Sequence, residues 1–227
     1  GQNMMRKDGE EHKRERHVIF PTVSPKTTQN VWKQKFMDHT KKILNNLSKK
    51  QEIDLVNEFA KPVSAEALKS ITGLTNMTWQ EMDRVSQGMI DGCANYNQNK
   101  MVEENCHRCT ASIDFHIQER LEQDLGSDPS LLSVFALKNE KFEIISANVK
   151  LAISGGQNEP RDAIAGTIAT LLQNPIQLEK ILNGEFDWLI AFEEYARWMS
   201  PIGMSPRRIA KDFSYKGFNF FENDRVF

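Results

Sequence analysis

The sequence predicts a mainly α-helical domain with a small β element near its C-terminus. Apolar residues recur at helical spacing along most of the chain, and Ser24-Pro25 and Asn174-Pro175 each combine a cap residue with proline at the first helical position. After Ser200-Pro201 the pattern changes, and aromatic residues stand among glycine and asparagine, as in short strands joined by turns. Strands do not alternate with helices, which argues against a βαβ fold.

The composition is that of an ordinary soluble globular protein. The 227 residues are 39% hydrophobic and 26% charged, and no run of 18 apolar residues predicts a membrane span. The first residues lack the apolar core of a signal peptide, and three cysteines do not make a disulfide framework. We therefore expect a cytoplasmic protein in which residues 1–227 belong to one domain.

The net charge of −2 conceals an uneven distribution. Residues 1–50 contain 12 Lys and Arg against 5 Asp and Glu, whereas the remainder contains 17 against 26. A basic face of this kind attracts an acidic protein, nucleic acid or an anionic cofactor. The alternative is a helix whose basic side chains are simply solvated.

The expected helices follow one another along the chain. Thr78-Trp79-Gln80-Glu81 has the capping-box pattern, and Asn183-Gly184 is a stop signal. Residues 53–72 are expected to hold a short extended piece followed by a helix. The other predicted helices cover residues 8–20, 24–49, 78–93 and 101–125, a short segment from residue 128, the apolar stretch from residue 144, and residues 175–182 and 186–199.

The most apolar of these helices is interrupted by Gly155-Gly156-Gln157-Asn158-Glu159-Pro160. Glycine destabilises a helix through backbone entropy, and proline removes a backbone donor. Two interpretations stay open. The interruption is either a plain kink or a widened turn that makes room for a ligand beside the helix.

Two pairs of side chains are spaced to share a helix face. Glu194 and Arg197, at i and i+3, can form an ion pair. His12 and Arg16, at i and i+4, place an imidazole beside a guanidinium, which suits a carboxylate or phosphate. Taken singly, each pair also occurs in ordinary helices, as a structural ion pair or as two solvated residues.

Cys106 and Cys109 form a Cys-x-x-Cys pair on the predicted helix of residues 101–125. A zinc or redox site would normally need a second ligand pair or a thioredoxin-like βαβ unit, and the sequence has neither. A structural role is favoured. A zinc- or redox-active helical protein remains an alternative.

Taken in order, these motifs resemble the cytochrome P-450 family, the haem-thiolate monooxygenases, of the soluble bacterial type. Asp8 followed by His12-x-x-x-Arg16 is similar to the family's early helix, although Gly9-Glu10 stands where Pro-Pro is usual. Residues 151–165 look like the long central helix that crosses the haem. The resemblance covers essentially the whole chain but only the middle of a family member, so we expect an internal fragment.

The resemblance implies haem as the cofactor. His12 and Arg16 would hold haem propionates, and Arg208, in the strand region, would reach a propionate as well. Glu194 and Arg197 match the family's Glu-x-x-Arg, an ion pair that stabilises the core beside the haem. The cysteine that ligates the iron is expected beyond Phe227, since none of the three cysteines present lies in a suitable loop.

The central helix departs from the family pattern. Gly155 and Gly156 would let dioxygen and substrate approach the haem. The acid and threonine that usually follow are replaced by Asn158 and Glu159, with Pro160 next. We therefore hypothesise that Glu159 supplies protons through water, because a carboxyl group with a suitable pKa can relay them.

The implied function is insertion of one oxygen atom from O2 into a small hydrophobic substrate. Electrons would come from NAD(P)H through a ferredoxin or flavodoxin-type donor attracted by the basic N-terminal segment, with no role for nucleic acid. Trp79, Met82 and Met89 are candidates for the substrate pocket, or else ordinary core residues. The alternative function is a non-catalytic helical module for ligand binding or protein interaction.

Overall fold

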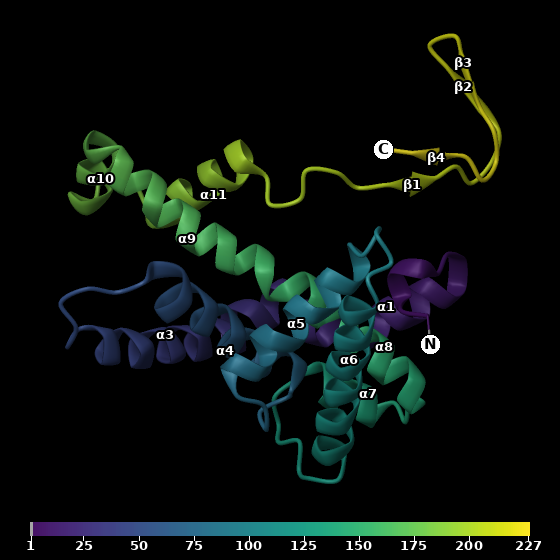
Figure 1. The fold of residues 1–227 in the computed structure, drawn as a ribbon, viewed down its shortest axis with the longest axis horizontal. Helices are drawn as coiled ribbons and strands as arrows, with labels where there is room; N and C mark the ends of the chain where they lie inside the picture. Colours follow the sequence, from purple (N-terminus) through teal and green to yellow (C-terminus); the bar gives the residue numbers. More distant parts are fainter. Residues whose placement is uncertain (1) are drawn as a thin grey trace. The chain divides into compact units, whose positions relative to one another are not determined.

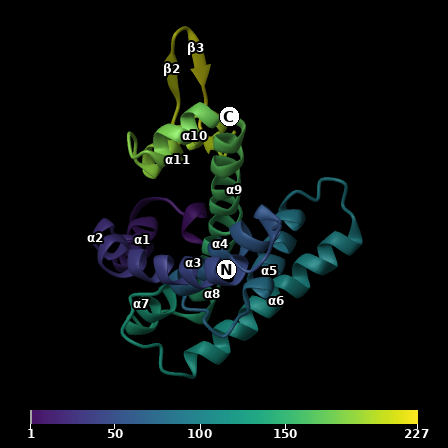
Figure 2. The same ribbon diagram turned by 90° about the vertical axis from the view of Figure 1, so that its left-hand side faces the viewer.

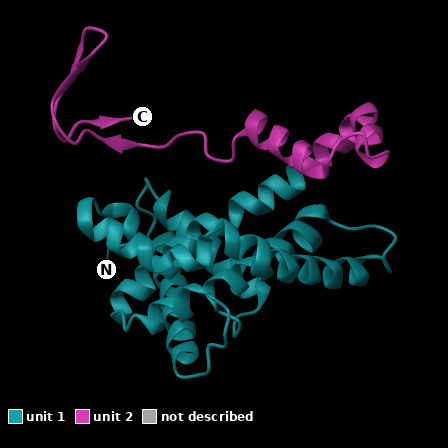
Figure 3. Cartoon of the chain, turned by 180° about the vertical axis from the view of Figure 1, so that it is seen from behind, with its two compact units in different colours: residues 1–166 teal, residues 167–227 magenta. Residues whose placement is uncertain are grey.

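The computed structural model describes residues 2–227, which form two compact units, residues 1–166 and 167–227 (Figures 1 and 3). The predicted fold class is confirmed, since the chain is mainly helical and its strands lie near the C-terminus. Whether residues 1–227 act as one domain stays a prediction.

The first unit is entirely helical in its regular structure. Its elements are η1 (Met4–Arg6), α1 (Gly9–Val23), α2 (Pro25–Thr27), η2 (Thr28–Trp32), α3 (Lys33–Leu47), η3 (Leu55–Ala60), α4 (Lys61–Thr72), α5 (Trp79–Cys93), α6 (Lys100–Leu121), α7 (Leu131–Leu137), α8 (Phe142–Gly156) and most of α9 (Asn158–Gln173).

Two predicted helix starts are confirmed by side-chain caps. The Ser24 hydroxyl accepts a hydrogen bond from the backbone N–H of Thr27, and the Thr78 hydroxyl accepts one from that of Glu81. Each bond satisfies a donor that the first helical turn leaves open. The Glu81 carboxylate pairs with Arg84 of its own helix.

The extended piece predicted at the start of residues 53–72 is confirmed. It ends at Asp54, whose carboxylate accepts hydrogen bonds from two following backbone N–H groups and so starts η3. One other predicted start was misplaced. Asp128-Pro129 does not open α7. Ser130 does, because its hydroxyl accepts from the backbone N–H of Ser133.

The core of the first unit lies among α4, α5, α6, α7 and α8. Helices α5 and α6 run side by side (Figure 2), and they approach closely because Gly88 and Gly92 present no side chain to α6. A Cβ at Gly88 would lie 2.3 Å from the Cys109 sulfur. Buried apolar side chains of this core include Leu68, Met82, Ile113, Phe135 and Val149.

The second unit contains the end of α9, α10 (Pro175–Leu182), α11 (Trp188–Met199) and four short strands, β1 (Arg207–Arg208), β2 (Phe213–Tyr215), β3 (Phe218–Phe220) and β4 (Arg225–Val226). Strands β2 and β3 form an antiparallel hairpin. Its turn residues Lys216 and Gly217 have φ of 51° and 83°. Two consecutive positive φ angles are what a tight hairpin turn requires.

Strand β1 pairs antiparallel with β4, so that Arg208 lies opposite Arg225. Pro175 is the first residue of α10 and Asn174 is its N-cap residue, as predicted, but the Asn174 side chain makes no cap hydrogen bond in the described structure. Its side-chain amide donates to the carbonyl of Thr170 at 2.8 Å, and it therefore closes the end of α9.

Among the described residues, no helix is both long and apolar enough to cross a bilayer.

Candidate functional site

The interruption predicted in the central helix is an opened turn between α8 and α9. Helix α8 ends at Gly156, α9 begins at Asn158, and Gln157 lies between them. The Ser64 hydroxyl of α4 donates to the carbonyl of Gln157 at 2.7 Å and lies 3.4 Å from that of Gly156. Neighbouring helices thus satisfy carbonyls that a continuous helix would satisfy itself.

The two glycines of this turn differ in their surroundings. A Cβ at Gly156 would lie 2.8 Å from a methyl group of Leu68, so this residue lets α8 pack against α4. Gly155 is exposed, and a Cβ there would meet nothing within 4 Å. Open space beside Gly155 fits the interpretation of a widened turn, whereas Gly156 has a packing role.

Gln157 is fully buried, and the sequence analysis assigned it no role. Its side-chain N–H groups donate to the carbonyl of Lys61 at 3.4 Å and to the Asp83 carboxylate at 3.2 Å. Lys61 and Asp83 form an ion pair of their own at 3.1 Å. Gln157 therefore fastens the opened turn to α4 and α5. The signal that could have pointed to Gln157 is a glutamine directly after two glycines in an apolar helix.

Asn158 and Glu159 occupy the first turn of α9. The Asn158 side chain accepts a hydrogen bond from Arg161 at 3.0 Å. One carboxylate oxygen of Glu159, Oε2, is buried and has no hydrogen-bond partner among residues 2–227, and the same holds for Oε1 of Gln157. Two buried acceptors without donors, two residues apart, are the setting in which proteins hold ordered water.

His12 and Arg16 lie on α1, one turn apart. The imidazole Nδ1 is 2.9 Å from the backbone carbonyl of Met4. The Arg16 side chain is exposed and makes no hydrogen bond or ion pair within residues 2–227. The two groups therefore offer one imidazole nitrogen and a whole guanidinium to an anionic ligand.

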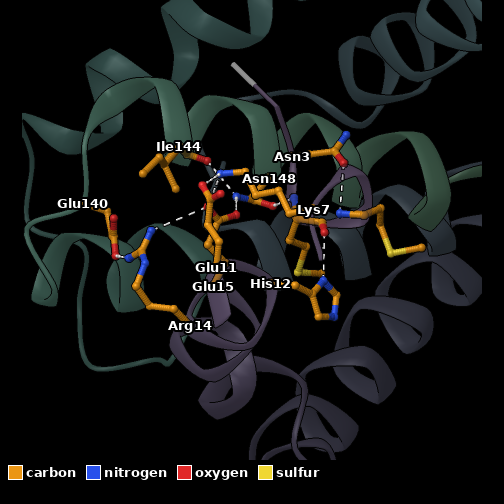
Figure 4. A network of polar contacts seen from close by, with 11 residues as sticks. Asn3, Lys7, Glu11, His12, Arg14, Glu15, Glu140, Ile144 and Asn148 are labelled. Atoms are coloured by element: carbon orange, nitrogen blue, oxygen red, sulfur yellow. Dashed lines mark hydrogen bonds and ion pairs between the residues drawn. The ribbon is translucent and has the colours of Figure 1, made fainter. Parts of the chain in front are cut away.

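A buried polar network lies behind this pair (Figure 4). The side chain of Glu15 is fully buried, and it pairs with Lys7 at 2.6 Å and accepts from the amide of Asn148 at 3.0 Å. The Asn148 oxygen accepts from the backbone N–H of Met4 at 2.9 Å. Lys7 also binds Glu11, and both contacts raise the pKa of Lys7, that with Glu11 more than that with Glu15.

Sequence reasoning missed this network because Glu15 belongs to a helix with charges on all sides. Nothing in the run of residues 8–16 marks one acid as buried. The helical period alone could have given a hint, since Glu15, Val18, Ile19 and Thr22 share one face and are all buried. The network joins α1 to α8, the helix that carries the opened turn.

The second unit contains Glu194, Arg197 and Arg208. Arg197 donates two hydrogen bonds of 2.7 Å to the Glu194 carboxylate, in the geometry that the i, i+3 spacing predicts. Both side chains are more than 60% exposed. The Arg197 guanidinium lowers the pKa of Glu194. Arg208 is exposed on β1.

A groove of about 530 Å³ lies within the second unit, between α10, α11 and the end of α9. Its lining is mostly apolar and includes Ile181, Phe186, Ile190 and Trp198, with Glu194 at its side. The polar residues of its lining are Thr167, Thr170, Asn174, Gln177, Glu194 and Tyr195.

The remaining candidates belong to the core. Cys109 is buried and Cys106 half-buried on the face of α6 that packs against Gly88 and Gly92, and burial raises the pKa of the Cys106 thiol. No group of three or more His, Cys, Asp or Glu in residues 2–227 could hold a metal ion.

The side chains proposed for the substrate pocket are also accounted for. Met82 and Met89 are buried in the core of the first unit, and Trp79 packs against that core. For these three residues the alternative, ordinary core, describes the structure.

No protein-family model matches the chain. Among curated proteins it is 23% identical over 229 residues to the polyketide biosynthesis cytochrome P-450 PksS of Bacillus subtilis, covering 99% of this chain and 56% of PksS. It is 20% identical to the biotin biosynthesis cytochrome P-450 of the same organism, covering 100% and 58%. The chain thus spans somewhat more than half the length of the curated relatives it matches.

Solved structures show the same relationship. The structure of P-450 BioI, in complex with an acyl carrier protein ligated to hexadec-9Z-enoic acid, superposes with a TM-score of 0.83 at 21% sequence identity. The superposition covers 98% of this chain and 58% of the other. The arrangement of helices and short strands is therefore that of a bacterial cytochrome P-450, as the order of motifs predicted.

Proposed function

The chain is homologous to bacterial cytochromes P-450 along its whole length, and from this premise we propose that its protein is a haem-thiolate monooxygenase. The reaction is the insertion of one oxygen atom from O2 into a small hydrophobic substrate. The observation that supports it best is the opened turn, in which Gly155 faces open space and Glu159 has an unpartnered buried oxygen.

Haem, when bound, supplies the oxidation chemistry, and the chain supplies binding, orientation and protons. The residues present fit its propionates. Arg16 is exposed with no partner in the described part of the chain, and the second nitrogen of His12 is free. Arg208 would add a third charge-assisted donor. Guanidinium and imidazole are the groups that bind carboxylates most strongly.

The three cysteines present do not fit the role of iron ligand. Cys109 is buried between α5 and α6, and burial raises the pKa of Cys106, which disfavours a thiolate. Cys93 is exposed near the end of α5. We therefore place the iron-ligating cysteine in a part of the protein outside these 227 residues.

On the oxygen side, Glu159 is the proton donor in this proposal. Its Oε2 has no partner among the described residues, so water entering the opened turn would find an acceptor there. Gly155 leaves the space through which dioxygen and substrate approach. Three contacts keep the turn open. Gly156 leaves room for Leu68, Asn158 accepts from Arg161, and Gln157 donates to Asp83.

The Glu159 proposal is tested by peroxide release during turnover of the full-length protein. Glu159→Gln should divert NAD(P)H electrons into peroxide and lower product yield, because the amide cannot donate the proton. Asp162→Asn, which makes the same change at an exposed carboxylate of α9, is the matched control. Unchanged coupling in Glu159→Gln would remove Glu159 from the mechanism.

The electron donor is proposed to be an acidic ferredoxin or flavodoxin, itself reduced by NAD(P)H in the cytoplasm. Seven Lys and Arg side chains of residues 1–50 are exposed and have no acidic partner in the described structure. They are Arg6, Arg16, Lys26, Lys33, Lys41, Lys42 and Lys49. Charges of this kind speed association with an acidic partner and lose their effect at high salt.

The class of function is tested by the spectrum of the reduced full-length protein with carbon monoxide. A thiolate-ligated haem gives a characteristic red-shifted absorption band, and we expect that band. Its absence in folded, haem-loaded protein would favour the alternative, a non-catalytic helical module. The names of the two Bacillus relatives place them in polyketide and biotin biosynthesis, and lipophilic acyl chains are accordingly the first substrates to try.

A further inference from the structure

The ring of His12 is held in one tautomer. Its Nδ1 lies 2.9 Å from the carbonyl oxygen of Met4. A carbonyl oxygen can only accept hydrogen bonds, so Nδ1 must carry the hydrogen. In the neutral ring Nε2 then has no hydrogen and can only accept. No other described residue forms a hydrogen bond to this ring.

The Met4 carbonyl is itself fixed. The backbone N–H of Met4 donates to the side chain of Asn148 at 2.9 Å, and the same Met4 carbonyl also accepts from the backbone N–H of Lys7 at 3.2 Å. Asn148 in turn donates to buried Glu15 at 3.0 Å (Figure 4). Turning the ring to free Nδ1 would break its hydrogen bond to this fixed carbonyl, which makes exchange of the tautomer costly.

We infer that His12 binds a carboxylate only as the imidazolium, so that binding of an anionic ligand at α1 takes up one proton. A carboxylate oxygen accepts, and Nε2 can donate to it only when the ring carries both hydrogens. Arg16, one turn further on, supplies a charge that does not depend on pH. This inference rests on the proposed function, in which the carboxylate is a haem propionate.

The charged side chains around the His12 ring are mostly paired with one another. We therefore expect the ring to gain its second proton when the ligand binds. Lys7 holds both Glu11 and Glu15, Lys13 is paired with Glu10, and Arg14 is paired with Glu140, which precedes α8. Asn148, through which α8 joins the network behind His12, is neutral, and Lys150 of the same helix is paired with Asp114. The charged residues from η1 to Arg16 are Arg6, Lys7, Asp8, Glu10, Glu11, Lys13, Arg14, Glu15 and Arg16. The ligand carboxylate would therefore be the main new charge beside the ring.

The test is calorimetry of haem binding to the full-length protein stripped of haem, in two buffers of different ionisation enthalpy and from pH 5.5 to 8.5. The wild type should take up about one proton more than His12→Gln, whose amide donates at any pH. The ratio of its affinity to that of His12→Gln should fall with rising pH, by up to about tenfold per pH unit. His17→Gln, at an exposed position on the same helix, should behave as wild type.

Equal proton uptake in the wild type and His12→Gln would overturn the inference. If His12→Gln does not fold, His12→Asn, whose amide also donates at any pH, takes its place, and proton uptake equal to that of the wild type overturns the inference in the same way. Haem binding without this proton linkage leaves the proposed function intact, whereas failure of the wild type to bind haem overturns both.

Discussion

Two Glu-x-x-Arg pairs lie on helices of this chain with nearly the same internal geometry. Arg84 binds Glu81 of α5 through hydrogen bonds of 2.6 and 2.7 Å, and Arg197 binds Glu194 of α11 through two of 2.7 Å. Their surroundings differ. Glu81 is 24% exposed and also accepts from the Ser112 hydroxyl of α6, whereas Glu194 is 61% exposed and makes no bond outside its pair.

The comparison separates what spacing determines from what packing determines. An i, i+3 spacing is sufficient to form the ion pair in either helix. Whether the pair matters to stability depends on burial and on a third partner, which only the pair of α5 has. The ion pair of Lys7 with Glu15 is more buried than either of these pairs, because the Lys7 side chain is 10% exposed and the Glu15 side chain is fully buried.

The largest effect is expected at the most buried pair. Lys7→Met should lower the free energy of unfolding by about 3 kcal/mol, because it leaves the buried Glu15 carboxylate without its lysine. Lys13→Met is the matched control, since Lys13 pairs with Glu10 on the same helix while both are exposed. Urea denaturation measures both. A Lys7→Met protein as stable as the control would show that Asn148 and Arg14 satisfy Glu15 without the lysine.

A smaller effect is expected at the half-buried pair. Glu81→Gln should cost about 1 kcal/mol, because the amide loses the charge-assisted bonds from Arg84 and weakens the bond from Ser112 that joins α5 to α6. Combining it with Ser112→Ala in a double-mutant cycle separates the two contacts. Strictly additive effects would mean that the hydrogen bond from Ser112 to Glu81 contributes nothing to stability.

The same pair predicts the response to acid. Arg84, and secondarily Ser112, lowers the pKa of Glu81 in the folded chain. A lowered pKa means that the contribution to stability is complete above the ordinary glutamate pKa of about 4.3 and is lost as pH falls through the folded value. The stability difference between wild type and Glu81→Gln should therefore shrink between pH 5 and pH 3. Parallel curves would contradict this assignment.

The sequence predicted what depends on neighbours in the chain. The helix at residues 78–93 followed from a capping pattern, and the break at Gly155-Gly156 from the conformational cost of glycine in a helix. The order of the motifs identified the fold, although no single motif was specific.

Long-range contacts were the part that could not be predicted. Nothing near Gln157 in the sequence shows that its amide meets Asp83, 74 positions earlier, nor does residue 15 show that it meets residue 148. Such contacts depend on which helix faces meet. The exposed Glu194 was singled out from the resemblance, whereas Glu81, whose carboxylate joins two helices, received attention only as a capping residue.

The smallest effect is expected at Glu194 and Arg197. In the 227-residue chain, Arg197→Gln should leave the denaturation midpoint unchanged, because solvent screens an exposed pair and each charge is hydrated without its partner. In the full-length protein the family resemblance predicts the opposite, loss of folded, haem-loaded protein, since additional chain would bury the pair and leave Glu194 uncompensated. Measuring both proteins decides whether burial alone separates this pair from that of α5. An equally small effect in the full-length protein would mean that the two pairs differ in more than their burial.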